Sequence, residues 1–310
     1  METQPLVAAG LDIGTNTILM VVAARSAAGE VNVLTDEHSV ARLGADVDKT
    51  GRISDAALAR ALPILERYAA LCAQYAVQSV RAVTTSAMRD ASNSAAVRAE
   101  LERALGYPIS VIDGEQEARL SFRGASPGGR STVIDIGGGS TEIVSGDDAG
   151  PQHARSLDIG AVRLSERHFP ALPPTAEQAD AARSSVRNYL QAIDWSDFGT
   201  LVGVGGTPSS LAAMALELDQ MRPVELDGRT ISAGEIARLC DQLLHTDVET
   251  IRAHPAIHPH RADILPMGSI ILDEIMQFCA ADSLRISVRG LRYGALLEAF
   301  DAVTNKNGLV

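Results

Sequence analysis

Lysine is almost absent from this sequence: only Lys49 and Lys306 occur among its 27 basic residues, so arginine carries nearly all of the positive charge. Acidic residues are in excess, which leaves a formal net charge of −12. An acidic chain without a basic block is a poor candidate for general nucleic-acid binding. A few arginines that converge locally could still bind a polyanion, because electrostatic focusing is local.

Cysteines, aromatic residues and long apolar runs are also scarce. The three cysteines are far apart and form no CxxC pair, which favours free thiols over disulfides or a metal site. The longest apolar run, residues 18–24, is far shorter than the ~20 residues of a membrane span. No basic region followed by an apolar region marks a signal peptide at the N-terminus. We therefore expect a cytoplasmic protein that binds neither membrane nor nucleic acid.

What the sequence does contain is a repeated motif. "DIGTNT" begins at Asp12 and "DIGGGST" at Asp135, 123 residues later, which is the spacing of a duplicated domain. Predicted strands alternate with predicted helices along both halves, as in α/β folds. We expect domains at 1–124 and 125–310, divided near "GASPGGR", with a ligand cleft between the two similar halves. Strands are expected at 7–13, 18–24, 31–40, 132–137 and 143–146, and helices at 54–75, 97–105, 175–193, 264–278 and 291–300.

Three glycine turns indicate phosphate binding. Without a Cβ, backbone N–H groups and nearby hydroxyls can approach an anion closely. One such turn alone would be read as a tight hairpin, but two of the three stand beside an aspartate. The candidate phosphate-binding residues are Gly14, Thr15, Asn16 and Thr17 in the first turn, Gly137, Gly138, Gly139, Ser140 and Thr141 in the second, and Gly205, Gly206 and Thr207 in the third.

Two aspartates follow strands that are expected to be buried. A buried carboxylate is costly unless it is paired or metal-bound, and oxygen ligands beside phosphate favour Mg²⁺. Asp12 and Asp135 are therefore candidate metal ligands. The alternative is that each carboxylate caps its own glycine turn, and this alternative is stronger for Asp12.

Six motifs occur in a characteristic order: "DIGTNTILM", "TTSAMRDASN", "IDGEQEARLSF", "VIDIGGGSTEIV", "LDIGAVRLSERHF" and "GVGGTPSSLAAM". Together they cover nearly the whole chain, and the sequence resembles the exopolyphosphatase/guanosine pentaphosphate phosphatase (Ppx/GppA) family in its short form. The resemblance implies two duplicated ribonuclease-H-like domains of the actin-like ATPase superfamily. It also allows the closing helix, about residues 291–303, to pack back on the first domain.

The resemblance implies roles for five residues. Glu117 in "EQEAR" would activate water, with Glu115 as the candidate if the register is shifted. Arg89 would lie near the scissile phosphate, although a surface ion pair with Asp90 or Glu100 is the alternative on the residues alone. Glu142 matches an acidic residue that contacts metal or water, beside Asp135 as the Mg²⁺ ligand. Arg261 in "HRADILPMG" could reach substrate phosphates.

The implied activity is exopolyphosphatase, the Mg²⁺-dependent, processive hydrolysis of the terminal phosphate of inorganic polyphosphate. Guanosine pentaphosphate 5′-phosphohydrolase is the close alternative, because both substrates end in the same anhydride. An actin-fold kinase and a non-catalytic sensor of guanosine tetra- or pentaphosphate are alternatives of another class. The resemblance also implies a homodimer and is compatible with a monovalent cation such as K⁺.

Overall fold

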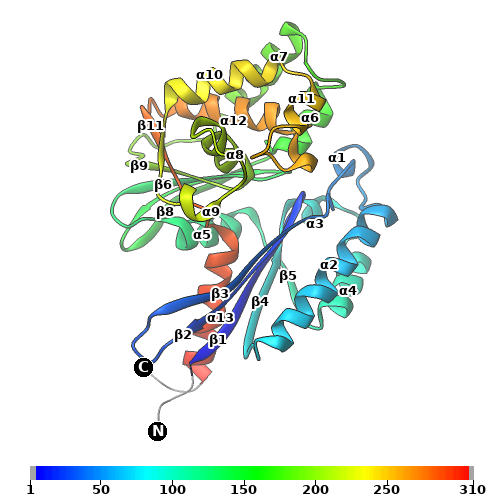
Figure 1. The fold of residues 1–310 in the computed structure, drawn as a ribbon, viewed down its shortest axis with the longest axis vertical. Helices are drawn as coiled ribbons and strands as arrows, with labels where there is room; N and C mark the ends of the chain where they lie inside the picture. The colour runs from blue at the N-terminus through cyan, green and yellow to red at the C-terminus, as the bar shows by residue number, and fades with distance from the viewer. Residues whose placement is uncertain (1–4, 307–310) are drawn as a thin grey trace. The chain divides into compact units, whose positions relative to one another are not determined.

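The computed structural model describes residues 5–306 of the chain (Figure 1). Contacts divide it into two compact units, with one boundary between Gly124 and Ala125 and the other between Gly290 and Leu291. The sequence assigned residues 291–310 to the second domain while allowing the closing helix to pack on the first. In the structure that helix belongs to the first unit, so the second unit ends at Gly290.

The first unit is built on a five-stranded sheet of order β3-β2-β1-β4-β5. Strand β1 pairs antiparallel with β2 and parallel with β4. The elements of this unit, in chain order, are β1 (Leu6–Ile13), β2 (Thr17–Arg25), β3 (Val31–Val40), α1 (Val47–Thr50), α2 (Asp55–Gln74), β4 (Ser79–Thr84), α3 (Ser86–Asp90), α4 (Ser94–Leu105), β5 (Ile109–Val111), α5 (Gly114–Ala125) and α13 (Leu291–Lys306).

Both faces of this first sheet are covered, which explains why its central strands are almost continuously apolar. Side chains alternate between the faces along each strand. On β1, Ala9 and Leu11 pack into the core that contains residues of α2 and α4, whereas Ala8 packs with Leu296 and Phe300 of α13. Figure 1 shows α2 and α4 in blue and cyan and α13 in red.

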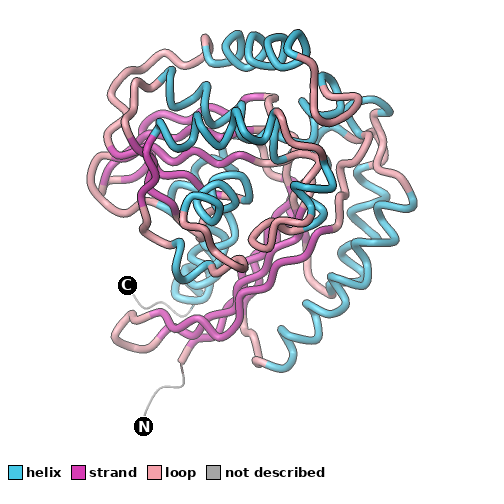
Figure 2. The backbone as a smooth tube through the Cα atoms, turned by 45° about the horizontal axis from the view of Figure 1, so that its top comes forward, coloured by secondary structure: helices cyan, strands magenta, loops and turns pink. Residues whose placement is uncertain are grey.

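The second unit has a six-stranded sheet of order β10-β11-β9-β6-β7-β8. Its large core contains side chains of this sheet and of the helices that follow β8. Figure 2 shows the strands in magenta and the helices in cyan. The elements are β6 (Ser131–Ile136), β7 (Thr141–Asp147), β8 (Gly150–Leu157), α6 (Ala161–His168), α7 (Ala176–Leu190), β9 (Thr200–Val204), α8 (Gly206–Ala215), α9 (Pro223–Leu226), β10 (Thr230–Ser232), α10 (Ala233–Leu244), α11 (Val248–Arg252), a 3₁₀ turn at Pro259–Arg261, α12 (Leu265–Phe278) and β11 (Ser283–Ile286).

The duplication predicted from the two "DIG" motifs is confirmed in the sheets. In each unit, three consecutive strands form an antiparallel meander, and the next strand pairs parallel with the first of the three: β4 with β1 and β9 with β6. The turns also agree: Gly14 N–H donates to Thr17 C=O at 2.9 Å, and Gly137 N–H donates to Ser140 C=O at 3.0 Å. Both glycines and both acceptors are 123 residues apart, so the repeat extends to single hydrogen bonds.

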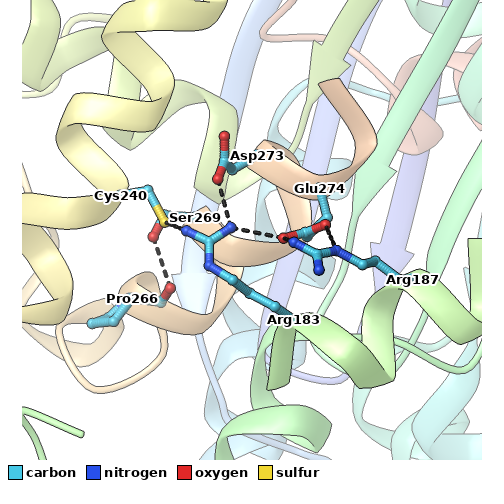
Figure 3. Close-up of polar contacts among 7 residues, drawn as sticks. All are labelled: Arg183, Arg187, Cys240, Pro266, Ser269, Asp273 and Glu274. Atoms are coloured by element: carbon cyan, nitrogen blue, oxygen red, sulfur yellow. Dashed lines mark hydrogen bonds and ion pairs between the residues drawn. The ribbon is translucent and has the colours of Figure 1, made fainter. Parts of the chain in front are cut away.

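A network of ion pairs lies between α7 and α12 of the second unit (Figure 3). Arg183 donates to Asp273 at 2.6 Å and to Glu274 at 2.8 Å, and Arg187 donates to Glu274 at 2.6 Å and 2.9 Å. Only 2% of the Glu274 side chain is exposed. Three charge-assisted bonds satisfy this buried carboxylate, so the network fixes α12 against α7.

The sequence located most of these elements but missed several short ones. The helices expected from residues 54 and 175 begin directly after Ser54 and Thr175, and each of these hydroxyls accepts a backbone N–H of its helix. The segment between α8 and the 3₁₀ turn was left without elements, yet it contains β10 and the amphipathic helix α10. In the described part of the chain, no helix has the length and apolar character needed to cross a membrane.

Candidate active site

The first predicted phosphate turn joins β1 to β2 at Gly14–Thr17. Its shape is maintained by a neighbouring turn, because the Asn16 carbonyl accepts hydrogen bonds from the N–H groups of Ala41 and Arg42 at 3.1 Å and 2.9 Å. The Thr15 carbonyl accepts the Gly44 N–H at 2.8 Å. The carbonyls of the turn are thus engaged, whereas within residues 5–306 the N–H groups of Thr15 and Asn16 donate to no backbone carbonyl. These two N–H groups are available for an anion.

The side chain of Asn16 is unusual for a buried amide. Only 5% of the residue is exposed, and neither its amide nitrogen nor its amide oxygen has a hydrogen-bond partner within the described chain. A buried unsatisfied amide costs about 1–3 kcal/mol for each unmet group. A polar ligand at the turn would remove this cost, so Asn16 fits a binding role better than a structural one.

The second turn, Gly137–Ser140, joins β6 to β7 and is held from the start of α6. The Gly137 carbonyl accepts the Ala161 N–H at 2.9 Å, and the Gly138 carbonyl accepts the N–H groups of Val162 and Arg163. Nε of Arg163 donates to the Gly139 carbonyl at 2.6 Å. Within the described residues, the N–H groups of Gly138 and Gly139 donate to no backbone carbonyl. The second turn therefore repeats the chemistry of the first.

Beside the second turn, two carboxylates stand directly opposite each other. Asp135 on β6 pairs in register with Glu142 on β7, and only 1% of Glu142 is exposed. Ser156 donates to Oε1 of Glu142 at 2.7 Å. Directly opposed like charges on antiparallel strands destabilise a sheet, and a divalent cation would neutralise them. The pair therefore fits the predicted Mg²⁺ ligands.

The predicted third metal ligand, Asp12, lies in the other unit, where a Cβ on Gly14 would be 3.6 Å from its Oδ1. Among the described residues, no cluster of three or more His, Cys, Asp or Glu side chains could hold a metal. Mg²⁺ in phosphate sites commonly uses one or two carboxylates together with substrate phosphates and water. Asp135 and Glu142 could supply these two carboxylates without Asp12.

The third turn, Gly205–Thr207, connects β9 to α8 and contacts both Asp135 and Arg261. Gly205 has a φ of +88°, and a Cβ there would lie 3.2 Å from Oδ1 of Asp135. A Cβ on Gly206 would overlap the guanidinium of Arg261. Burial lowers the pKa of Arg261 to about 10, so the side chain is charged at neutral pH but poorly solvated. The turn thus brings a cation and a carboxylate to the N-terminus of a helix.

The first unit also carries the predicted water-activating residue. Glu117 lies in the first turn of α5 and is only 7% exposed. Arg89 of α3 donates from Nη1 to Oε2 of Glu117 at 2.7 Å and to the Ile112 carbonyl at 3.0 Å. This contact replaces the surface ion pair with Asp90 or Glu100 that the residues alone allowed.

The alternative carboxylate, Glu115, has a different environment. Its side chain is 64% exposed and forms an ion pair with Arg119 at 2.7 Å, four residues along the same helix. Such exposed pairs contribute little and impose no special chemistry. Of the two glutamates, only Glu117 combines burial with a fixed cationic partner.

Sequence reasoning assigned no role to Gly160, which closes the "LDIG" motif before α6. A Cβ on Gly160 would overlap the backbone of Gly138 and Gly139, so only glycine permits this approach to the second turn. The sequence did offer a signal for this glycine, because the letters "DIG" occur there for a third time. Its meaning depends on a contact with residues about 20 positions away, which the pattern does not reveal.

Comparisons with known proteins agree with this arrangement. The chain matches the Ppx/GppA phosphatase family over residues 21–302. It is 35% identical to an exopolyphosphatase 2 of Mycobacterium tuberculosis over 86% of this chain and 89% of that protein. It is 28% identical to a guanosine-5′-triphosphate,3′-diphosphate pyrophosphatase of Pseudoalteromonas atlantica, over 93% of this chain but 57% of that longer protein.

A solved structure supports the fold assignment. The crystal structure of an exopolyphosphatase-like protein superposes with a TM-score of 0.92 at 32% identity, covering 97% of this chain and all of that one. This match and the duplicated sheets confirm the predicted actin-like α/β fold class. The family match spans nearly the whole chain and includes the second and third candidate turns, whereas the first turn, at residues 14–17, precedes it. The chain therefore belongs to the Ppx/GppA phosphatase family.

Proposed function

We propose that this protein is an exopolyphosphatase, which hydrolyses the terminal phosphoanhydride bond of inorganic polyphosphate. The observation that carries the proposal is the buried Glu117 carboxylate held by Arg89, because it combines a fixed carboxylate that can orient water with a cation that can neutralise phosphoryl oxygens. The high coverage of the exopolyphosphatase from M. tuberculosis supports polyphosphate as the substrate.

In the proposed reaction, Glu117 orients water and accepts its proton as the water oxygen attacks the terminal phosphorus. The bond from that phosphorus to the bridging oxygen breaks, which releases inorganic phosphate and a chain shorter by one unit. Arg89, bonded to Glu117, restrains this carboxylate and contributes positive charge near the phosphoryl oxygens. The N–H groups of the two glycine turns and the Arg261 guanidinium hold the phosphates of the chain.

We propose Mg²⁺ as the cofactor, held by Asp135 and Glu142. When bound, it would supply positive charge that screens the phosphate oxygens during attack. The adjacent Ser156 hydroxyl restrains the Glu142 carboxylate, and Gly205 leaves room beside Asp135. A homodimer, a cytoplasmic location and a contribution from a monovalent cation such as K⁺ complete the proposal.

Hydrolysis of guanosine pentaphosphate is the second candidate, favoured by the similarity to the P. atlantica pyrophosphatase. The same reacting groups would serve both substrates, because both end in a terminal phosphoanhydride. This chain spans only 57% of that relative, whereas it spans 89% of the exopolyphosphatase. The difference in coverage favours polyphosphate.

The decisive experiment measures phosphate release from long-chain polyphosphate and from guanosine pentaphosphate, each with Mg²⁺ and with EDTA. We expect Mg²⁺-dependent release that is faster from polyphosphate and is abolished in Glu117→Gln. Faster release from guanosine pentaphosphate would assign the second function. Absence of release from both substrates, with an intact fold by circular dichroism, would overturn the hydrolase assignment.

A further inference from the structure

The first unit contains a small apolar cluster that is separate from its main core. It consists of Val83, Ile112, Leu120 and Leu291, each at most 5% exposed. Three of these residues lie between positions 83 and 120, but Leu291 is the first residue of α13 and comes from the other end of the chain. The cluster therefore closes only when α13 has docked.

Each of the other three members is attached to a part of the candidate site. The Ile112 carbonyl accepts the second hydrogen bond of Arg89. Leu120 follows Glu117 by three positions on α5, and residues at this spacing lie on the same side of a helix. Val83 on β4 pairs in register with Asp12 on β1. Loss of packing in this cluster would therefore displace the Ile112 carbonyl that bonds Arg89 and the turn of α5 that carries Glu117.

The position of Leu291 is closely determined by glycines on α13 and at its start. Gly294 packs so tightly on α5 that a Cβ there would overlap the Leu120 carbonyl. Gly290, joined to Leu291 by one peptide bond, has a φ of +97° that disfavours other residues, and a Cβ there would be 3.8 Å from Oδ2 of Asp135. Leu291 therefore follows a backbone conformation that favours glycine and lies one turn before the close contact of Gly294 with α5.

We propose that Leu291 is a positioning residue for Glu117 and Arg89: its side chain supports the first turn of α5 and the Ile112 carbonyl in the geometry that water activation requires. This inference rests on the proposed hydrolase function for its kinetic consequence. The physical reason is that a carboxylate displaced by about 1 Å can lose a hundredfold in rate, whereas binding by groups elsewhere is unaffected.

The test compares Leu291→Ala with Leu101→Ala. Leu101 is a fully buried leucine on α4 of the same unit, and it belongs to the main core and not to the cluster of Leu291. With polyphosphate and Mg²⁺, we expect Leu291→Ala to lower kcat about 10-fold to 100-fold with KM changed less than threefold. The acid limb of the pH profile of kcat should also shift in Leu291→Ala. Leu101→Ala should lower Tm but keep kcat within twofold, measured where both proteins are folded, and Leu291→Met should recover most of the rate.

A second measurement does not depend on activity. Hydrogen exchange of the segment 112–121 should accelerate in Leu291→Ala and keep the wild-type rate in Leu101→Ala. Unchanged exchange in this segment, or a kcat and pH profile equal to wild type, would overturn the positioning role while leaving hydrolysis by Glu117 intact. If the wild type released no phosphate, the proposed function would fail, and exchange would still decide whether Leu291 supports the first turn of α5.

Discussion

Arg89 binds Glu117 through a 2.7 Å bond from Nη1 to Oε2, although 28 residues separate the two in sequence. Glu115, only two residues earlier on the same helix, is exposed and bonded to Arg119. The same helix turn thus carries one carboxylate in a fixed, partly desolvated pair and one on the surface. This difference allows the two glutamates to be separated by experiment.

We expect Glu117→Gln to lower kcat for phosphate release by about 10²–10⁴-fold, because the amide retains the shape of the side chain but cannot accept a proton. Glu115→Gln, the matched change on the surface, should keep kcat within about twofold, as expected for an exposed pair. Steady-state phosphate release by both purified variants checks this prediction. The opposite ranking would assign water activation to Glu115.

The close packing of Gly206 against Arg261 in the third glycine turn predicts the effect of adding a side chain there. In Gly206→Ala the new methyl group would overlap the Arg261 guanidinium and force it away from the turn. We expect KM for polyphosphate to rise at least about tenfold, since a charge-assisted contact contributes about 1.5–3 kcal/mol. Titration of substrate with each variant provides the measurement.

The control for this change is Gly234→Ala on α10, where a Cβ meets nothing within 4 Å. Alanine is a better helix former than glycine by about 0.8–1.0 kcal/mol, so this variant should be slightly more stable with unchanged kinetics. Equal KM values for Gly206→Ala and wild type would show that Arg261 does not hold substrate at this turn.

The lowered pKa of Arg261 predicts a pH limit for binding. Burial disfavours the charged form, so the pKa falls to about 10, and the side chain is protonated below this pH and neutral above it. In the Glu117→Gln background, which prevents turnover, affinity for polyphosphate should fall about tenfold or more as pH rises through 10. Equilibrium binding in wild type and in Arg261→Met measures the effect. The same fall in Arg261→Met would assign the titration to another group.

How far the sequence predicts this structure depends on whether a contact is local or repeated. The two strand–turn–strand motifs were predictable, because the letters recur 123 residues apart and the hydrogen bonds recur with them. The Arg89–Glu117 bond was not, because no periodicity links α3 to α5. Only the family resemblance named both residues as a set.

Asn93 shows why a local rule can fail. Its place before α4 favours a helix cap, but its side chain makes no cap bond. Its amide instead exchanges two hydrogen bonds with the backbone of Ile53, at 3.0 Å and 2.9 Å. A partner 40 residues away offered both a donor and an acceptor, which satisfies the amide more completely than one helix N–H.

The ion-pair network between α7 and α12 gives a prediction about stability rather than activity. Glu274→Ala removes the acceptor shared by Arg183 and Arg187 and leaves a poorly solvated guanidinium beside the buried Cys240 thiol (Figure 3). We expect a loss of about 1.5–3 kcal/mol in the free energy of unfolding, the contribution of hydrogen bonds to a charged group. A larger loss is not expected, because Arg183 keeps its 2.6 Å bond to Asp273 and the Arg187 side chain is exposed to solvent. Urea unfolding monitored by Trp195 fluorescence measures the change.

Glu249→Ala provides the comparison for Glu274→Ala, since Glu249 also bonds an arginine, Arg252, but on the surface of α11. An exposed pair contributes about 0–1 kcal/mol, so the free energy of unfolding should hardly change. The two variants remove the same chemical group and differ mainly in burial. Equal losses would mean that desolvation is not what makes the Glu274 network important, and that α12 is held by its apolar contacts alone.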